Sequence, residues 1–216
     1  MIHFWSSFGA FTEDPSRWAK IVSWLLAATI GITVHEFAHA KRADQAGDPT
    51  PRANGRLTLN PLAHYDPIGT TMLLLLGFGW AKPVPTNPLN FRRPRHDDIM
   101  VALWGPISNI LAAVVFALGW RIYQAVTSEH AYDVLFSSVI MLNLILAFFN
   151  LIPVWPLDGH HIVLGLLPTD KAQQLEVFYH RFGAILLMGV VFLGWRIIAI
   201  PISIVYSLLT GVRGFF

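Results

Sequence analysis

Two histidines and a glutamate near residue 35 are the side chains best suited to chemistry, in the pentapeptide His35-Glu36-Phe37-Ala38-His39. Residues four apart lie on one face of an α-helix, so the two imidazoles can bind a single metal ion. Glu36 follows the first histidine and can act as a general base, taking a proton from the attacking water and passing it to the leaving amine. The pattern therefore predicts metal-assisted hydrolysis of a peptide bond.

A catalytic zinc ion needs three protein ligands and one open position, so a third ligand must come from elsewhere in the chain. The chain has no cysteine, which excludes disulfides and restricts the ligands to His, Asp and Glu. The best source is the segment from Asn150 to Gly159, where two prolines stop the helix and Asp158 is the one carboxylate. A turn residue before glycine is the alternative interpretation of Asp158, which the nearby histidine pair outweighs.

The composition indicates a membrane protein. Of 216 residues, 54% are hydrophobic and only 13% are charged, whereas a soluble domain has about 25% charged residues. Polar surface is too scarce to cover a water-exposed globule, so much of the surface is expected to face a lipid bilayer. The net charge of +2 comes from basic residues in loops rather than in a run or stripe, and we therefore predict no nucleic-acid binding.

Four apolar segments are long enough, or nearly so, to cross a bilayer, which takes about 20 helical residues. They run from about Trp18 to Ala40, Ile99 to Val126, Val134 to Ile152 and Phe182 to Leu209. The last contains Arg196 and Pro201 and could be one long tilted helix or a broken one. We predict an all-α membrane protein, a polytopic bundle of about four to five transmembrane helices.

A shorter apolar stretch between Pro67 and Gly79 is too short to cross comfortably, and the glycines and prolines up to Pro85 exclude a continuous helix. We expect a re-entrant segment or a short β-hairpin here, after the catalytic helix. Irregular backbone is allowed at membrane depth where protein or a wet cavity covers it.

Basic residues concentrate between the first and second spans. If Pro67–Gly79 does not cross, they all share one side, and the positive-inside rule makes that side cytoplasmic. They are Lys41, Arg42, Arg52, Arg56, Lys82, Arg92, Arg93 and Arg95. The third span returns to the same side, which brings residues 150–160 to the side of His39. The loops are too short for a second domain, so residues 1–216 are expected to form a single integral-membrane domain.

Together these motifs resemble the site-2 protease family of intramembrane zinc metalloproteases. The resemblance rests on residues 35–39 and on the N-x-x-P-x-x-P-L-D-G element at 150–159, with support from Asn60–Gly69 and Gly105–Asn109. These elements extend over most of the chain from residue 35 to residue 159. The chain has no room for the PDZ or paired CBS modules of larger members, so it resembles a small member that lacks them.

The resemblance implies a zinc ion held by His35, His39 and Asp158, with Glu36 as the general base. In the family, the residue corresponding to Asn150 is placed near the site. Its amide could donate to the tetrahedral oxyanion or orient the substrate backbone.

The resemblance also implies cleavage of peptide bonds in or near transmembrane segments of other membrane proteins, as in regulated intramembrane proteolysis. An irregular loop after the catalytic helix, here about Gly77–Val84, would hold the substrate as an added strand. The expected location is the cell membrane, with the active site toward the cytoplasmic side. A regulatory membrane partner or a homo-oligomer could control substrate entry.

A multi-pass transporter or channel that binds a metal in transit is the alternative function, since intramembrane His and Asp suit it too. Transporters usually have two related halves and ligands along a path. This chain shows one compact ligand set and no repeat, and Glu36 is required for catalysis but not for metal binding. These features favour the protease.

Other polar residues have interpretations that compete with a role in the site. His64 is expected to hydrogen-bond in a loop rather than bind metal, and Asn109 to bond a neighbouring helix rather than act in catalysis. His160 and His161 could tune the site, although interface or capping roles are favoured. His39 could simply reach the interface at a helix end, but three ionisable groups in one apolar turn argue for function.

Overall fold

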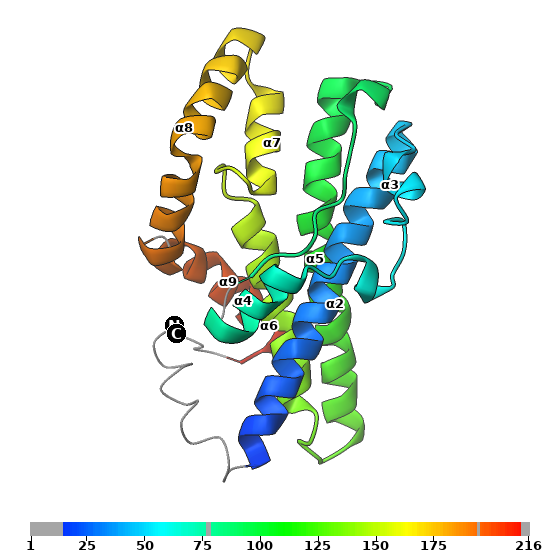
Figure 1. Ribbon diagram of the computed structural model, residues 1–216. Helices are drawn as coiled ribbons and strands as arrows, with labels where there is room; N and C mark the ends of the chain where they lie inside the picture. The colour runs from blue at the N-terminus through cyan, green and yellow to red at the C-terminus, as the bar shows by residue number, and fades with distance from the viewer. Residues whose placement is uncertain (1–14, 77–78, 194, 213–216) are drawn as a thin grey trace.

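The computed structural model describes residues 15–76, 79–193 and 195–212, and its regular structure in these ranges is helical (Figure 1). No strand is assigned there, so the all-α prediction is confirmed and the β-hairpin alternative is not found among the described residues. The helices are α2 (Pro15–Ala46), α3 (Thr50–Ala53), η2 (Pro61–Ala63), α4 (Pro67–Leu76), η3 (Pro88–Asn90), α5 (Pro94–Val126), α6 (Asp133–Asn150), α7 (Asp158–Leu166), α8 (Thr169–Leu193) and α9 (Trp195–Thr210).

Four of the described helices are long and apolar enough to cross a membrane, by length and composition. They cover Arg17–Ala46, Pro94–Val126, Asp133–Asn150 and Thr169–Phe192. The first three correspond to predicted spans. The chain is therefore a multi-pass membrane protein, in agreement with its composition.

The fourth predicted span corresponds to two described helices, α8 and α9, and α8 begins earlier than the hydropathy indicated. Residues 169–181 are largely polar, so an apolar window excludes them, but they include Lys, Ala, Gln, Leu and Glu, which favour helix. Residue 194, between the two helices, lies outside the described residues. Pro201 lies inside α9.

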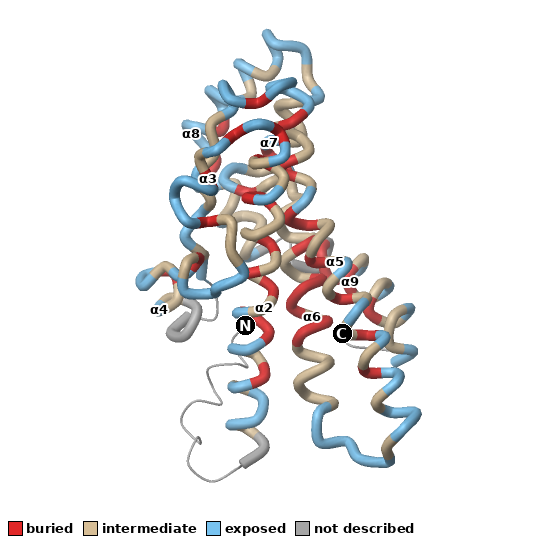
Figure 2. Tube along the Cα trace, turned by 90° about the vertical axis from the view of Figure 1, so that its right-hand side faces the viewer, coloured by how far each residue is buried: buried red, intermediate tan, exposed pale blue. Residues whose placement is uncertain are grey.

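The centre of the bundle is formed by α2, α5 and α6, with α9 packed against α5 and α6. Figure 2 shows the buried positions gathered along these helices, whereas α8 is mostly exposed. Small residues let the backbones approach closely, as membrane helices require. Ala27 and Ala28 of α2 are buried against Val139 and Leu142 of α6, and a Cβ on Gly31 would lie 2.8 Å from Leu146 Cδ1.

The apolar stretch after the catalytic helix forms α4, which has ten residues. At about 1.5 Å per residue it is too short to cross a bilayer. The chain then returns without regular structure, and within residues 79–84 Lys82 N–H donates to His64 O (3.0 Å). The backbone N–H of Val84 donates to the carboxylate of Glu36 on α2 (3.2 Å). This arrangement fits the re-entrant alternative; Gly77 and Phe78 lie outside the described residues.

Candidate metal centre

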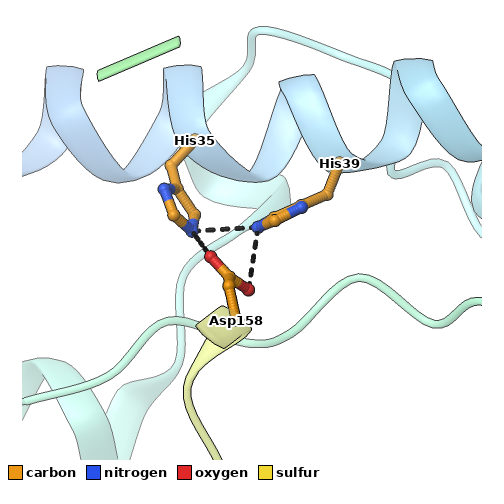
Figure 3. Close-up of side chains that lie close together, drawn as sticks. All are labelled: His35, His39 and Asp158. Carbon is orange, nitrogen blue, oxygen red and sulfur yellow. Dashed lines mark hydrogen bonds and ion pairs between the residues drawn. The ribbon is translucent and has the colours of Figure 1, made fainter. Parts of the chain in front are cut away.

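Figure 3 shows three side chains, His35 and His39 from α2 and Asp158 from the start of α7, pointing toward one another. The two imidazole Nε2 atoms are 2.9 Å apart. Asp158 Oδ2 lies 3.2 Å from His35 Nε2, and Asp158 Oδ1 lies 3.4 Å from His39 Nε2. The two histidines are buried and Asp158 is half-buried. The structure thus brings together the three residues that the sequence offered as metal ligands.

Asp158 reaches the histidines through a run of turns that follows α6. Helix α6 ends at Asn150, and turns lead to Leu157, whose extended backbone precedes the first residue of α7. A Cβ on Gly159 would lie 2.4 Å from the carbonyl oxygens of both Leu151 and Ile152. Only glycine allows this approach, which explains the Asp-Gly pair in the motif.

Hydrogen bonds fix which nitrogen of each histidine faces the carboxylate. His35 Nδ1 lies 2.6 Å from Asn109 Oδ1, and His39 Nδ1 lies 2.8 Å from the carbonyl oxygen of Val101. The Asn109 amide nitrogen donates elsewhere, so both contacts are to acceptors and each Nδ1 must carry the proton. Each Nε2 then presents a lone pair toward Asp158.

This donor set fits a metal cation. In the neutral tautomers that these contacts select, two imidazole lone pairs converge with a carboxylate, and the buried Asp158 Oδ2 forms no hydrogen bond in the described structure. A buried acceptor without a donor needs an explanation. Three ligands of types His, His and Asp, each imidazole oriented through its other nitrogen, are what a catalytic zinc site requires.

Helix α5 closes one side of the centre through Gly105. A Cβ at this position would lie 2.3 Å from His39 Nε2 and 2.7 Å from His35 Cε1. The backbone of α5 can therefore approach the two imidazoles only because residue 105 has no side chain. This contact gives a physical reason for glycine at position 105.

A chain of amides connects His35 to α6. The Asn109 amide nitrogen donates to Gly31 O (2.9 Å) and to Asn143 Oδ1 (2.8 Å), and Asn143 donates to Val139 O (2.8 Å). Both asparagines are fully buried. The interhelical role expected of Asn109 is observed, and it also orients a proposed ligand. Asn143 was missed; its signal was an amide side chain in the middle of an apolar helix.

The two residues expected to act in catalysis lie in different surroundings. Glu36 is half-buried beside His35, and its Oε2 accepts the Val84 N–H. Asn150 is also half-buried, and its amide nitrogen donates to Leu146 O on its own helix (2.9 Å). In this structure the Asn150 amide is therefore engaged with α6 rather than with the three converging side chains.

The remaining histidines singled out in the sequence lie outside the converging set. His64 is buried in its loop, with Nε2 2.9 Å from Thr58 O. His160 packs edge-on against Tyr179, with ring centroids 5.0 Å apart. Burial, followed by the charge of His161, lowers the pKa of His160 to about 4, so it is neutral at pH 7. His161 contacts Asp98, with Nδ1 3.3 Å from Oδ2.

Comparison with known proteins agrees with this geometry. Residues 119–192 match Peptidase family M50. The chain is 38% identical over 179 residues to "Putative zinc metalloprotease YwhC" of Bacillus subtilis (strain 168), a match that covers 79% of this chain and 81% of that protein. No solved structure matches the chain at a significant level.

Two further relatives share shorter regions. The chain is 30% identical over 151 residues to "Putative zinc metalloprotease Rip2" of Mycolicibacterium smegmatis (strain ATCC 700084 / mc(2)155), covering 65% of this chain and 54% of that protein. Stage IV sporulation protein FB of Bacillus subtilis is 31% identical over 109 residues, covering 49% of this chain and 35% of that protein.

A membrane-spanning helix that carries two converging histidines, met by a carboxylate from a later turn, defines the class of intramembrane metallopeptidases. The chain belongs to peptidase family M50, the site-2 proteases, and is a zinc metallopeptidase. Family membership decides between the two functions left open by the sequence, in favour of the protease over the transporter or channel.

Proposed function

We propose that this protein is a zinc endopeptidase that cleaves peptide bonds in or near transmembrane segments of other membrane proteins, with His35, His39 and Asp158 as the zinc ligands. The observation that carries the proposal is the convergence of both Nε2 atoms and the Asp158 carboxylate beside a helix long enough to span a membrane. The tautomers enforced by Asn109 and the Val101 carbonyl support it.

Zinc at this position would supply a Lewis acid for peptide hydrolysis. Glu36 is the proposed general base, because it adjoins His35 on α2. With Oε2 held by the Val84 N–H, Oε1 remains to take the proton from the attacking water and return it to the leaving amine. Asn150 is proposed to stabilise the oxyanion, which requires its amide to turn away from Leu146 O.

The substrate must be extended when it is cut, because a helix hides its carbonyls in its own hydrogen bonds. Residues 79–84, the substrate segment, could pair with an unwound strand. Lys82 N–H already donates to His64 O, and neighbouring residues of an extended chain face opposite ways. Ala81 N–H and C=O therefore face the other edge, and they form no hydrogen bond within the described chain.

We further propose that the site faces the cytoplasm, because the loops around the substrate segment carry most of the basic residues. Residues 1–216 are treated as a single metalloprotease domain in the cell membrane. Its proposed partners are the lipid bilayer and transmembrane substrates, with a regulatory membrane protein or a second copy controlling access.

The test is co-expression with candidate single-span membrane proteins, comparing the wild type with Glu36→Gln. The variant keeps the shape of the side chain but loses the base, so turnover should fall by about 10²–10⁴ or more while zinc is retained. Purified wild type should hold about one zinc per chain. His35→Ala combined with His39→Ala should hold none, and full zinc occupancy in that double variant would disprove the ligand assignment.

A further inference from the structure

Arg56 is a buried arginine without an acidic partner in the described part of the chain. It is 4% exposed. Its Nη1 donates to the carbonyl oxygen of Ala63, and its Nη2 donates to those of Lys82 and Pro83, the latter at 2.7 Å. The guanidinium thus joins the loop before α4 to the substrate segment after α4.

Burying a cation without a carboxylate is costly, so the contacts that Arg56 makes require a reason. A guanidinium is a rigid planar fork whose two terminal nitrogens point to different acceptors at fixed angles. Three carbonyl oxygens from two segments match that fork. Lysine has the same charge, but its donors radiate from one atom, and it cannot span the same acceptors.

The two carbonyls bound by Arg56 lie directly before Val84, whose N–H donates to Glu36 Oε2 (3.2 Å). The N–H of Lys82 is held on the same side by His64 O (3.0 Å). The N–H groups of Lys82 and Val84, two residues apart, are therefore both bonded to the protein, whereas the Ala81 N–H and C=O form no hydrogen bond in the described chain. A small shift of Lys82 and Pro83 would move the docking edge and the donor to the proposed base together.

We propose that Arg56 is a positioning residue: its guanidinium holds the substrate segment so that Ala81 presents its backbone to the substrate and Val84 orients Glu36. The assignment rests on the proposed function, because the segment is assigned there as the substrate-docking edge. The proposal adds to that function the side chain, Arg56, that fixes the substrate segment in place.

The first experiment measures cleavage by Arg56→Gln and Arg56→Lys in the full-length protein. Displacement of the docking edge and of the Glu36 donor should lower kcat/KM about 10- to 100-fold in both variants. Zinc content should stay at the wild-type value. Arg52 is the matched control, because it lies on α3 four residues earlier, is exposed and pairs with Asp44; Arg52→Gln and Arg52→Lys should cleave normally.

The Arg56→Lys variant separates the effect of the guanidinium geometry from the effect of its positive charge. If Arg56→Lys cleaves like the wild type, Arg56 contributes only charge and the proposal is overturned. Wild-type activity in Arg56→Gln overturns the proposal as well.

If Arg56→Gln loses its zinc or fails to fold, Val84→Pro tests whether the substrate segment orients Glu36, because it deletes the N–H that donates to Glu36. This variant should lower kcat, with Thr86→Pro, whose N–H forms no hydrogen bond in the described chain, as its control.

A second readout needs no cleavage. The chain has no cysteine, so Ala81→Cys gives a single site for a nitroxide spin label on the substrate segment. The label should become more mobile when Arg56→Gln is added and should not change when Arg52→Gln is added. Unchanged mobility in the Arg56 variant overturns the positioning role. Absence of cleavage by the wild type on every substrate would instead count against the proposed function alone.

Discussion

His35 Nδ1 lies 2.6 Å from Asn109 Oδ1, a contact that connects α2 to α5 and turns His35 Nε2 toward Asp158. Loss of this acceptor frees the ring to rotate and to change tautomer. Asn109→Leu should therefore weaken zinc binding by about 10- to 100-fold, as is usual when the partner of a ligating histidine is removed. Competition with a chelator of known affinity measures the change.

Asn143→Leu should have a smaller effect on zinc, because Asn143 acts on His35 only through Asn109. Asn54, an exposed asparagine that bonds Thr50 O, provides a control in Asn54→Ala. The orienting role would be refuted if Asn109→Leu bound zinc as tightly as Asn54→Ala while remaining folded.

Gly105 yields a steric prediction. Gly105→Ala places a Cβ 2.3 Å from His39 Nε2, so a histidine or α5 must move and zinc occupancy should fall to near zero. Gly119→Ala is the matched control on the same helix, since its Cβ would lie 3.5 Å from Phe136 Cε1, an ordinary contact. Zinc content of purified protein and the thermal midpoint check both. Full occupancy in Gly105→Ala would show that α5 does not approach the histidines as described.

The parts of the site that were predictable depend on local periodicity. The helical repeat alone places His35 and His39 on one face of α2, and length with hydropathy sufficed for the first three spans. Asp158 was predictable from chain order and from the motif around it. A short stretch of sequence therefore suffices for the histidine pair and for each span, whereas Asp158 also needs the order in which the spans cross the membrane.

The parts that were not predictable depend on how helices rotate against one another. No pattern within α6 specifies that Asn143 meets Asn109, or that a Val101 carbonyl meets His39. The buried role of Arg56 was also hidden, because it was counted among the basic loop residues that set orientation. The start of α8 was missed because polar residues continue the helix beyond its apolar part.

Asp48 gives a prediction of pH dependence outside the membrane-spanning segments. Burial opposes its charge, but hydrogen bonds from Asn90, Thr50 and the Asn87 N–H outweigh this and hold the pKa of Asp48 below its usual value. A lowered folded-state pKa stabilises the fold above the unfolded pKa of about 3.9, and that contribution is lost as the pH falls further.

Asp48→Asn should thus lower the thermal midpoint at pH 7, because the charge that these donors stabilise is removed. The free energy of unfolding should fall by about 1–3 kcal/mol. The difference from the wild type should shrink as the pH falls below about 4. Thermal unfolding in detergent at several pH values measures it. A difference that stays constant from pH 7 to pH 3 would show that the charge of Asp48 is not what matters.

Ala81 provides the most direct test of how substrate is held. Its backbone N–H and C=O form no hydrogen bond in the described chain, whereas the next residue, Lys82, donates to His64 O. Ala81→Pro removes this donor and adds no charge, so cleavage should slow about tenfold or more while zinc content is unchanged.

The substrate offers the reciprocal change. An unwound segment in lipid leaves backbone groups that cost several kcal/mol each unless they are paired. Helix-breaking residues placed near the scissile bond reduce the work of unwinding, so they should speed cleavage by the wild type. The gain should be smaller with Ala81→Pro, because the unwound strand then lacks a partner for one of its carbonyls. If cleavage rates respond to neither change, the substrate does not add as a strand at Ala81 and must be held by another part of the protein.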